Sequence, residues 1–282
     1  MIGPIAGTFR DVWASRSGRI GILTLAIAIA GVLLLPPLLQ DPNAQFNILE
    51  GAVPPSLHHP FGTDQLNRDV LARVVRGAGI SFTVAFLSVT LSITLGAFVG
   101  LVAGYHGGWV DMLIMRLVDG ALAIPRLFIL LLLLAITQHI SLALFVIVLG
   151  TTGWFGVSRI VRGEALRIRH EVYVQAAEAL GASPKRVIFN HLLPNTAGPL
   201  LVAATLGVGD VILLEAGLSF LGLGVRPPTP TLGGMIHESR EIMLSGAWAS
   251  IFPGLAIVLT VLAVNLVGEA LRDSFDPKNA TS

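Results

Sequence analysis

Three acidic side chains inside otherwise apolar stretches are the residues of this sequence best placed to do chemistry. Asp119, Asp210 and Glu215 each lie within a hydrophobic run long enough to cross a bilayer. Because a charge in hydrocarbon is unfavourable, such residues face a cavity, one another or the head groups, where carboxylates can relay protons or meet a substrate. They predict either a transport path or structural hydrogen bonds between helices, and the residues alone leave both open.

The sequence shows no pattern that indicates an enzyme or a resident cofactor. It has no Gly-x-x-x-x-Gly-Lys-Ser/Thr phosphate loop, so energy for any pumping must come from a partner or an ion gradient. The adjacent His58 and His59 are typical of solvated loop residues, and no His-Glu-x-x-His spacing occurs. The lack of cysteine excludes disulfides and thiolate chemistry. No Ser/His/Asp arrangement follows from spacing, and no metal site is predicted.

Composition indicates an integral membrane protein. Of the 282 residues, 54% are hydrophobic and 12% are charged, with a mean hydropathy of +0.79. A soluble domain carries about twice that charged fraction. We therefore expect an all-α polytopic membrane fold with about six transmembrane helices. The expected spans are residues 20–39, 80–105, 112–136, 142–161, 197–220 and 248–267.

The positive-inside rule orients these spans. With the N-terminus inside, twelve Lys and Arg residues fall on the cytoplasmic side and five outside, so both termini are expected in the cytoplasm. A cleaved signal peptide is the alternative for the first span, but the long apolar run lacks a small-x-small cleavage site. The expected organisation is a cytoplasmic segment 1–19, a first transmembrane helix 20–39, an external loop 40–79, a five-helix core 80–270 and a cytoplasmic tail 271–282.

The loop and the second and third spans carry more specific signals. Leu71, Val74 and Val75 predict the apolar stripe of a short interfacial helix whose arginines are solvated. Glycines at 96, 100 and 104 predict a seam of close helix contact. If the third span is continuous, Arg116 and Asp119 lie on one face and could pair.

The polar stretch from Glu171 to Asn195 predicts two short helices that meet at a turn. Gly181 suits the end of the first helix, and Ser183 with Pro184 suits the start of the second, which would end near Pro194. A DNA-reading helix-turn-helix is disfavoured because long apolar segments on both sides hold this stretch at a membrane surface.

The same stretch resembles the EAA loop of bacterial ABC-importer permeases. The match consists of Gln175-Ala176-Ala177, Gly181 and His191-Leu192-Leu193-Pro194, with Gln175 where the family usually has glutamate. The resemblance implies a permease of the type I fold and a cytoplasmic elbow, residues 171–195, that docks into a partner ATPase. The implied coupling residues are Tyr173, Gln175, Ala176, Ala177, Leu180, Gly181, His191 and Pro194.

Three further stretches resemble the dipeptide, oligopeptide and nickel subfamily, in its second-permease type. They are residues 61–73, 217–230 and 268–277. Asn67 stands in place of glycine in the first stretch, and shortly after the first two stretches Gly79 stands in place of arginine and Leu232 in place of tryptophan. The resemblance implies import of short peptides, with nickel chelates or glutathione as related cargoes, across a bacterial cytoplasmic membrane.

The resemblance also implies the partners of the chain. These are a second homologous permease, two ATP-binding subunits that hold ATP and Mg, an external substrate-binding protein and membrane lipid, with no nucleic acid. Asp210, Glu215 and Ser219 are candidates for the substrate path, whereas Arg116, Asp119 and Pro125 are structural or gating candidates. The alternative is an ion-coupled secondary transporter that uses Glu215, Asp210 and Asp119.

Overall fold

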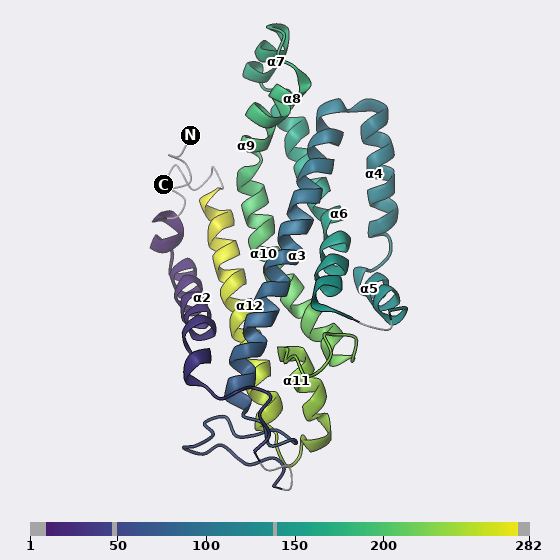
Figure 1. The fold of residues 1–282 in the computed structure, drawn as a ribbon. Coiled ribbons are helices and arrows are strands. Elements are labelled where there is room, and N and C mark those ends of the chain that lie inside the picture. The colour runs from purple at the N-terminus through teal and green to yellow at the C-terminus, as the bar shows by residue number, and fades with distance from the viewer. Residues whose placement is uncertain (1–9, 47–49, 138–139, 276–282) are drawn as a thin grey trace.

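The computed structural model shows an elongated helical bundle, and it describes residues 10–46, 50–137 and 140–275 (Figure 1). Within these residues the extended backbone pairs only at an isolated bridge between Thr63 and Asp69. The long helices are α2 (Arg16–Leu34), α3 (Val70–His106), α4 (Gly108–Leu122), α5 (Arg126–Ala135), α6 (Leu142–Arg169), α10 (Ala197–Phe220) and α12 (Trp248–Ser274). The short elements are η1 (Pro36–Leu38), α7 (Val172–Ala179), α8 (Pro184–Val187), η2 (Ile188–Leu192), α9 (Leu193–Asn195), α11 (Leu232–Glu238) and η3 (Ser239–Ile242).

Helix lengths confirm the predicted all-α membrane fold. In the described residues five helices are long and apolar enough to cross a membrane, and α4 with α5 would be a sixth span that bends by 77°. Pro125 lies directly before α5, where its missing N–H and its ring interrupt the helix. Residues 138–139, between the predicted third and fourth spans, and Asp276-Pro277, at the end of the stretch 268–277, lie outside the described residues.

The predicted interfacial helix is not a separate element. Residues 70–79 form the first turns of α3, which continues without a break to His106. The Asp69 side chain caps this helix by accepting a hydrogen bond from the Ala72 backbone at 2.8 Å, and no proline follows to stop it. Helices α6 and α12 likewise run beyond the predicted ends at residues 161 and 267.

The glycine seam of α3 packs against α6, as predicted. A Cβ atom on Gly100 would lie 2.6 Å from the carbonyl oxygen of Ser158, and one on Gly104 would lie 2.6 Å from the Ala165 Cβ. Larger side chains would push the two helices apart, so the small residues set their close approach.

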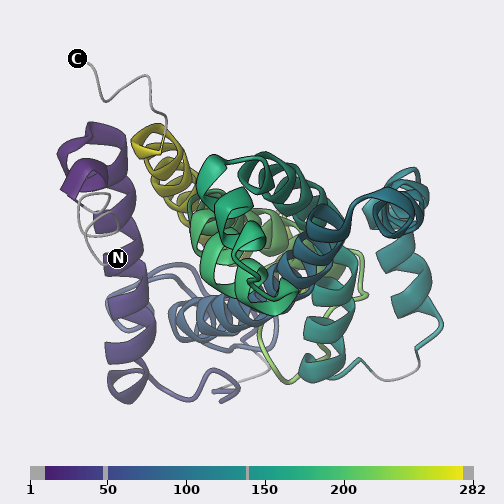
Figure 2. The same cartoon turned by 90° about the horizontal axis from the view of Figure 1, so that it is seen from above.

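The bundle has a centre and two flanks (Figures 1 and 2). Helices α3, α6, α10 and α12 form the centre, α2 lies against α12 on one flank, and α4 with α5 lies on the opposite flank. The start of α2 and the end of α12 lie toward the half of the molecule that carries α7 and α8, and α11 lies at the opposite end. The two ends therefore contain different parts of the chain.

Candidate functional site

The elbow, residues 171–195, contains the two helices and the turn that the sequence predicts. Helix α7 ends in a Schellman motif, in which the Ala182 N–H donates to the Ala177 carbonyl at 3.0 Å and the Gly181 N–H donates to the Glu178 carbonyl at 2.9 Å. Gly181 has a φ of +86°, which glycine adopts without strain. Ser183 caps α8 and Pro184 occupies its first turn.

The second half of the elbow ends near Pro194, as predicted, since α9 closes at Asn195, but it is not one uniform helix. After α8 the chain widens into the π-helical turn η2, narrows again in α9 and enters α10 at Ala197. Pro194 has no N–H and its ring crowds the preceding turn, so a normal helical hydrogen bond is lost there. A wider turn accommodates this loss without ending the helical path.

A fully buried base holds the elbow to the bundle. Val174, Val187 and Leu192 have no exposed surface, and they belong to one apolar cluster with Leu101 of α3 and Ile168 of α6. Short helices of this length are not stable alone, so this packing fixes their position. The elbow is therefore firmly attached to the two central helices.

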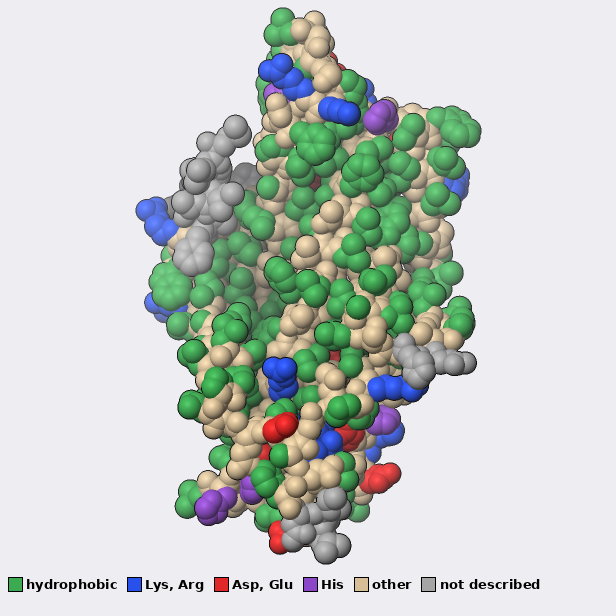
Figure 3. All heavy atoms as spheres, in the orientation of Figure 1, with side chains coloured by type: hydrophobic (Ala, Val, Ile, Leu, Met, Phe, Trp, Pro, Cys, Tyr) green, Lys and Arg blue, Asp and Glu red, His purple; other side chains and the backbone are tan. Residues whose placement is uncertain are grey.

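The outer face of the elbow exposes large apolar side chains. Leu180 is 90% exposed, Val172 is 82% exposed and Phe189 is 60% exposed. Figure 3 shows hydrophobic and basic side chains together at this tip of the molecule. Exposed apolar groups clustered on a rigid support are typical of a surface that binds another protein.

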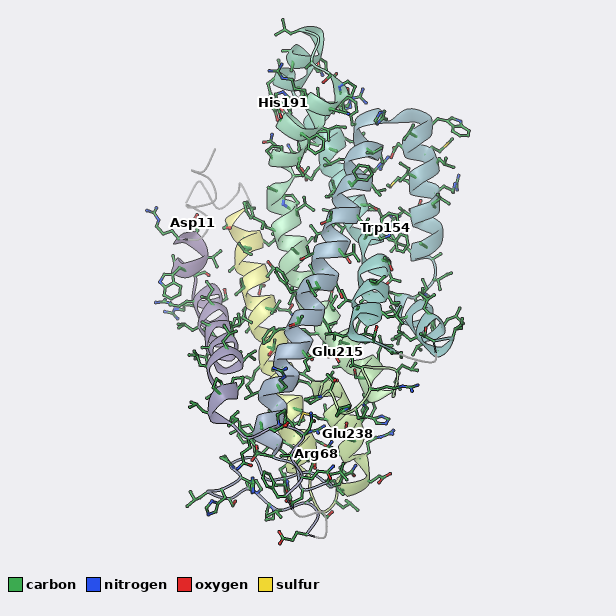
Figure 4. All side chains as sticks on the ribbon, viewed as in Figure 1. Asp11, Arg68, Trp154, His191, Glu215 and Glu238 are labelled. Carbon is green, nitrogen blue, oxygen red and sulfur yellow. The ribbon has the colours of Figure 1, made fainter. Side chains whose placement is uncertain are left out.

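The predicted coupling residues lie on or beside this face. Tyr173 is half exposed, and its ring lies 6.0 Å from that of His191, which Figure 4 labels near the tip. The Gln175 side chain donates to the His170 carbonyl at 3.2 Å. Ala176, Leu180, Gly181 and Pro194 are exposed, whereas Ala177 is partly buried.

The opposite end contains a cluster of four charged residues, of which Asp64, Arg68 and Arg73 are buried and Glu238 is partly exposed. Glu238 Oε2 accepts hydrogen bonds from Arg68 Nη2 at 2.5 Å and from Arg73 Nη2 at 2.9 Å. Asp64 Oδ2 accepts from Arg68 Nε at 2.7 Å. Figure 4 shows Arg68 and Glu238 close together beside α11. The prediction that the arginines of this stretch are solvated is wrong for Arg68 and Arg73, because partners far along the sequence enclose them.

Further contacts hold the segment that precedes α3, residues 50–69, and attach it to the bundle. Asp69 Oδ2 lies 2.8 Å from His59 Nδ1, and Trp248 of α12 donates from Nε1 to the Thr63 carbonyl at 2.9 Å. Among the described residues, no group of three or more His, Cys, Asp or Glu side chains is arranged to hold a metal ion. His59 thus serves as a structural partner of Asp69.

A polar cavity of about 360 Å³ lies beside this cluster. The stretch 217–230 forms one wall, and α11 and η3 form the other. Gly224 permits the loop to fold back, because a Cβ atom there would lie 2.0 Å from Ser219 Oγ. The cavity is lined by charged side chains of both signs, namely Arg226, Glu238, Arg240 and Glu241.

Glu215 and Ser219 are buried where α10 meets α3. Glu215 is 1% exposed, and its two oxygens accept hydrogen bonds at 2.8 Å from Ser81 of α3 and from Ser219. Figure 4 places Glu215 between the elbow and the charged cluster. The structure therefore gives Glu215 the contacts of a link between helices, while Ser219 also reaches the cavity wall.

Asp210 differs from Glu215 because its side chain is exposed. It interacts electrostatically with Arg126, the first residue of α5, to which the sequence analysis assigned no role. Arg126 crosses to α6, where its Nη2 donates to the Leu149 carbonyl at 2.6 Å and its Nε to Thr152 Oγ1 at 3.3 Å. In the sequence, the one signal for this role of Arg126 is its position directly after Pro125 in an otherwise apolar stretch.

The predicted pair between Arg116 and Asp119 is not formed. Asp119 Oδ1 instead accepts a hydrogen bond from Arg159 Nη2 of α6 at 2.7 Å, and Arg116 is exposed. About two turns earlier in α4, Asp111 accepts two hydrogen bonds from Arg162, at 2.7 and 2.5 Å. These ion pairs attach α4 to α6, which lie side by side. Residue spacing within a single helix does not reveal such pairs between helices.

Comparison with known proteins identifies the family. The family model described as "binding-protein-dependent transport system inner membrane component" matches residues 92–281, which include the elbow. The chain belongs to this family. It is thus a multi-pass transport component of the cytoplasmic membrane.

Individual members of the family are similar over nearly the whole chain. A dipeptide transport system permease protein from Alkalihalophilus pseudofirmus is 38% identical over 98% of this chain and 91% of its own length. An oligopeptide transport system permease protein from Bacillus subtilis is 34% identical over 94% of this chain and 87% of its own. A glutathione transport system permease protein from Pectobacterium atrosepticum is 36% identical over the same shares, 94% and 87%.

Proposed function

We propose that this chain is one of two permease subunits of an ATP-driven importer that brings short peptides into the bacterial cytoplasm. The rigid elbow with an exposed apolar face carries the proposal, because such a surface suits docking against another protein. The names of the dipeptide and oligopeptide relatives support peptides as cargo.

The energy comes from partners in this proposal. Two ATP-binding subunits hold ATP and Mg, and one of them receives the elbow in a groove. The elbow has its base fixed to α3 and α6 through Leu101 and Ile168, so movement of the ATPase reaches the bundle as a displacement of whole helices. Both termini and the elbow lie in the cytoplasm, and the charged cluster lies outside.

Substrate arrives from an external binding protein at the end that carries α11. A second homologous permease completes the path, since six spans enclose too little space alone. Asp210 is the exposed acidic candidate on this path, and Glu215 and Ser219 hold α10 against α3 behind it. Asp119 and Arg159 join α4 to α6, and Pro125 provides the bend, so these residues act in gating and not in substrate contact.

Substitution of Gly181 tests the docking of the elbow. A Cβ atom at Gly181 meets nothing within 4 Å in this chain, so a leucine there projects outward from the elbow. The strained backbone adds a penalty of about 1 to 2 kcal/mol for a residue with a Cβ atom. We expect Gly181→Leu to abolish ATP-driven transport, whereas Gly181→Asn, which tolerates positive φ, retains most of it.

The experiment is a mild-detergent pull-down of the tagged chain, followed by mass spectrometry and a transport assay in vesicles. We expect the wild type to recover a phosphate-loop ATPase and a second six-span protein, and Gly181→Leu to lose the ATPase while remaining in the membrane. Normal ATP-driven transport by Gly181→Leu, or gradient-driven transport by the chain alone, would contradict the proposal.

A further inference from the structure

An apolar groove of about 710 Å³ opens between α2, α3 and α10. Helix α2 packs mainly along α12, and it comes close to α3 at Gly79, where a Cβ atom would lie 2.9 Å from Val32 Cγ1. Beyond this point the two helices leave a space that Leu25, Phe86 and Val208 help to line. The groove therefore lies on the flank of the bundle, away from the α4 and α5 side.

The threonines in the groove offer no free hydrogen-bond donor. Each hydroxyl donates to the carbonyl oxygen four residues earlier in its own helix, at 2.8 Å for Thr83, 2.8 Å for Thr90, 2.7 Å for Thr94 and 2.9 Å for Thr205. The remaining lining is aliphatic, aromatic or glycine. A hydrocarbon chain can thus occupy the groove without burying an unsatisfied donor from these side chains.

One end of the groove leads to an exposed arginine. A smaller cavity of about 300 Å³ shares Val32, Leu33, Gly79 and Thr83 with the groove and extends it to Arg76. A further cavity of about 320 Å³ continues from Arg76 to residues 39–43 after η1. Arg76 makes no ion pair with any described residue.

The acidic residue near this end does not neutralise Arg76 by direct contact. Asp41 lines the outer cavity, and its Oδ1 accepts a hydrogen bond from the Asn43 backbone at 2.9 Å. Arg76 lies seven residues into α3, beside the chain that follows the end of α2, so it lies where the apolar spans reach the head-group level.

We propose that the groove binds an anionic phospholipid of the bilayer, with an acyl chain along α3 and the phosphate against Arg76. An apolar slot that ends at a cation with no ion pair among the described residues matches the two halves of such a lipid, the acyl chain and the charged head group. A bound lipid fills the space between α2 and the bundle, so α2 keeps its place through the lipid as well as through α12. This inference does not depend on the proposed function.

Native mass spectrometry of the purified wild-type transporter, titrated with phosphatidylglycerol or phosphatidylcholine, tests the site. We expect phosphatidylglycerol to bind preferentially, and Arg76→Gln to weaken its binding about fivefold, because one arginine near the surface contributes about that factor. Arg226→Gln, an exposed arginine far from the groove, is the matched control and should bind as the wild type does.

A second variant distinguishes binding of the lipid in the groove from simple attraction of its head group to a surface charge. Thr90→Phe places a ring in the groove without changing any charge, and we expect it to weaken binding of both lipids. Equal binding of phosphatidylglycerol by the wild type, Arg76→Gln and Thr90→Phe would overturn the proposal. So would a cross-link from Thr90→Cys to a helix of another permease chain, since the groove would then hold protein.

Discussion

The two ends of this molecule are attached to the bundle by different contacts, which are apolar at the elbow and charged at the α11 end. At the elbow, Leu180 and Val172 lie almost fully exposed above a buried base. At the α11 end, Arg68 and Arg73 are buried against Glu238. The comparison teaches that the elbow offers exposed apolar side chains on a buried apolar base, whereas the α11 end pairs its buried arginines with acidic residues of the same chain.

The difference has a physical basis in what each contact requires. Apolar side chains on a fixed support gain free energy when a partner removes them from water, and they release that partner without leaving a buried charge. A buried ion pair tolerates separation poorly, because each charge then remains in a medium of low dielectric. The elbow therefore suits repeated rearrangement, and the charged cluster suits a fixed joint between α3 and α11.

The largest expected effect on the free energy of unfolding comes from a substitution in the charged cluster at the α11 end. Arg73→Met removes a side chain that is 1% exposed and leaves Asp64 and Glu238 with a single arginine between them. We expect a loss of about 3 to 5 kcal/mol in the free energy of unfolding, measured by chemical denaturation in detergent.

Arg116→Met is the control for this prediction, because Arg116 lies on α4, away from the charged cluster, and is exposed. Its unfolding free energy should change by about 0.5 kcal/mol or less. Equal effects of the two substitutions would mean that the charged cluster does not fix this end.

Two leucine substitutions in the elbow distinguish the role of its buried base from that of its exposed face. Leu192→Ala removes a fully buried side chain, and we expect it to lower the free energy of unfolding by about 2 to 5 kcal/mol. Leu180→Ala removes a side chain that is 90% exposed, so unfolding should change by about 0.5 kcal/mol or less while ATP-driven transport falls. Unfolding assays and vesicle transport measure the two effects. Normal transport by Leu180→Ala would remove the exposed leucine from the docking face.

The smallest expected effect concerns an exposed ion pair. Arg159 Nη2 lies 2.7 Å from Asp119 Oδ1, and both side chains are about half exposed, at 55% for Arg159 and 51% for Asp119. We expect Asp119→Asn to change the free energy of unfolding by about 1 kcal/mol or less, since solvent screens such pairs. The Arg73→Met variant provides the contrast in the same denaturation experiment. A loss as large as that of Arg73→Met would show that exposure does not decide the strength of these pairs.

Local signals predicted the elbow and the spans well. Gly181, Ser183 and Pro184 act on their own backbone, so the sequence reveals the turn and the start of α8 directly. The bounds of α10, Ala197–Phe220, agree with the predicted fifth span because Asn195 and Thr196 precede the apolar run and Gly222, with a φ of +82°, ends the helix.

Contacts between distant residues were not predictable in this way. Arg73 and Glu238 are 165 residues apart, and Asp119 and Arg159 are 40 apart, so no spacing within a helix indicates either pair. The sequence placed Arg73 in solvent and Asp119 beside Arg116 because only neighbours along the chain were visible. The bend between α4 and α5 was signalled by Pro125, but its 77° angle depends on how α4 and α5 pack.

Cross-linking from single cysteines tests the central claim, that the elbow end meets the ATPase. The chain has no cysteine, so Leu180→Cys at the elbow and Leu57→Cys at the opposite end each carry one thiol. Both leucines are highly exposed, at 90% and 100%. In native membranes treated with a bifunctional maleimide, we predict a cross-link to a phosphate-loop ATPase from Leu180→Cys and none from Leu57→Cys. A cross-link to the ATPase from Leu57→Cys, with none from Leu180→Cys, would contradict the account.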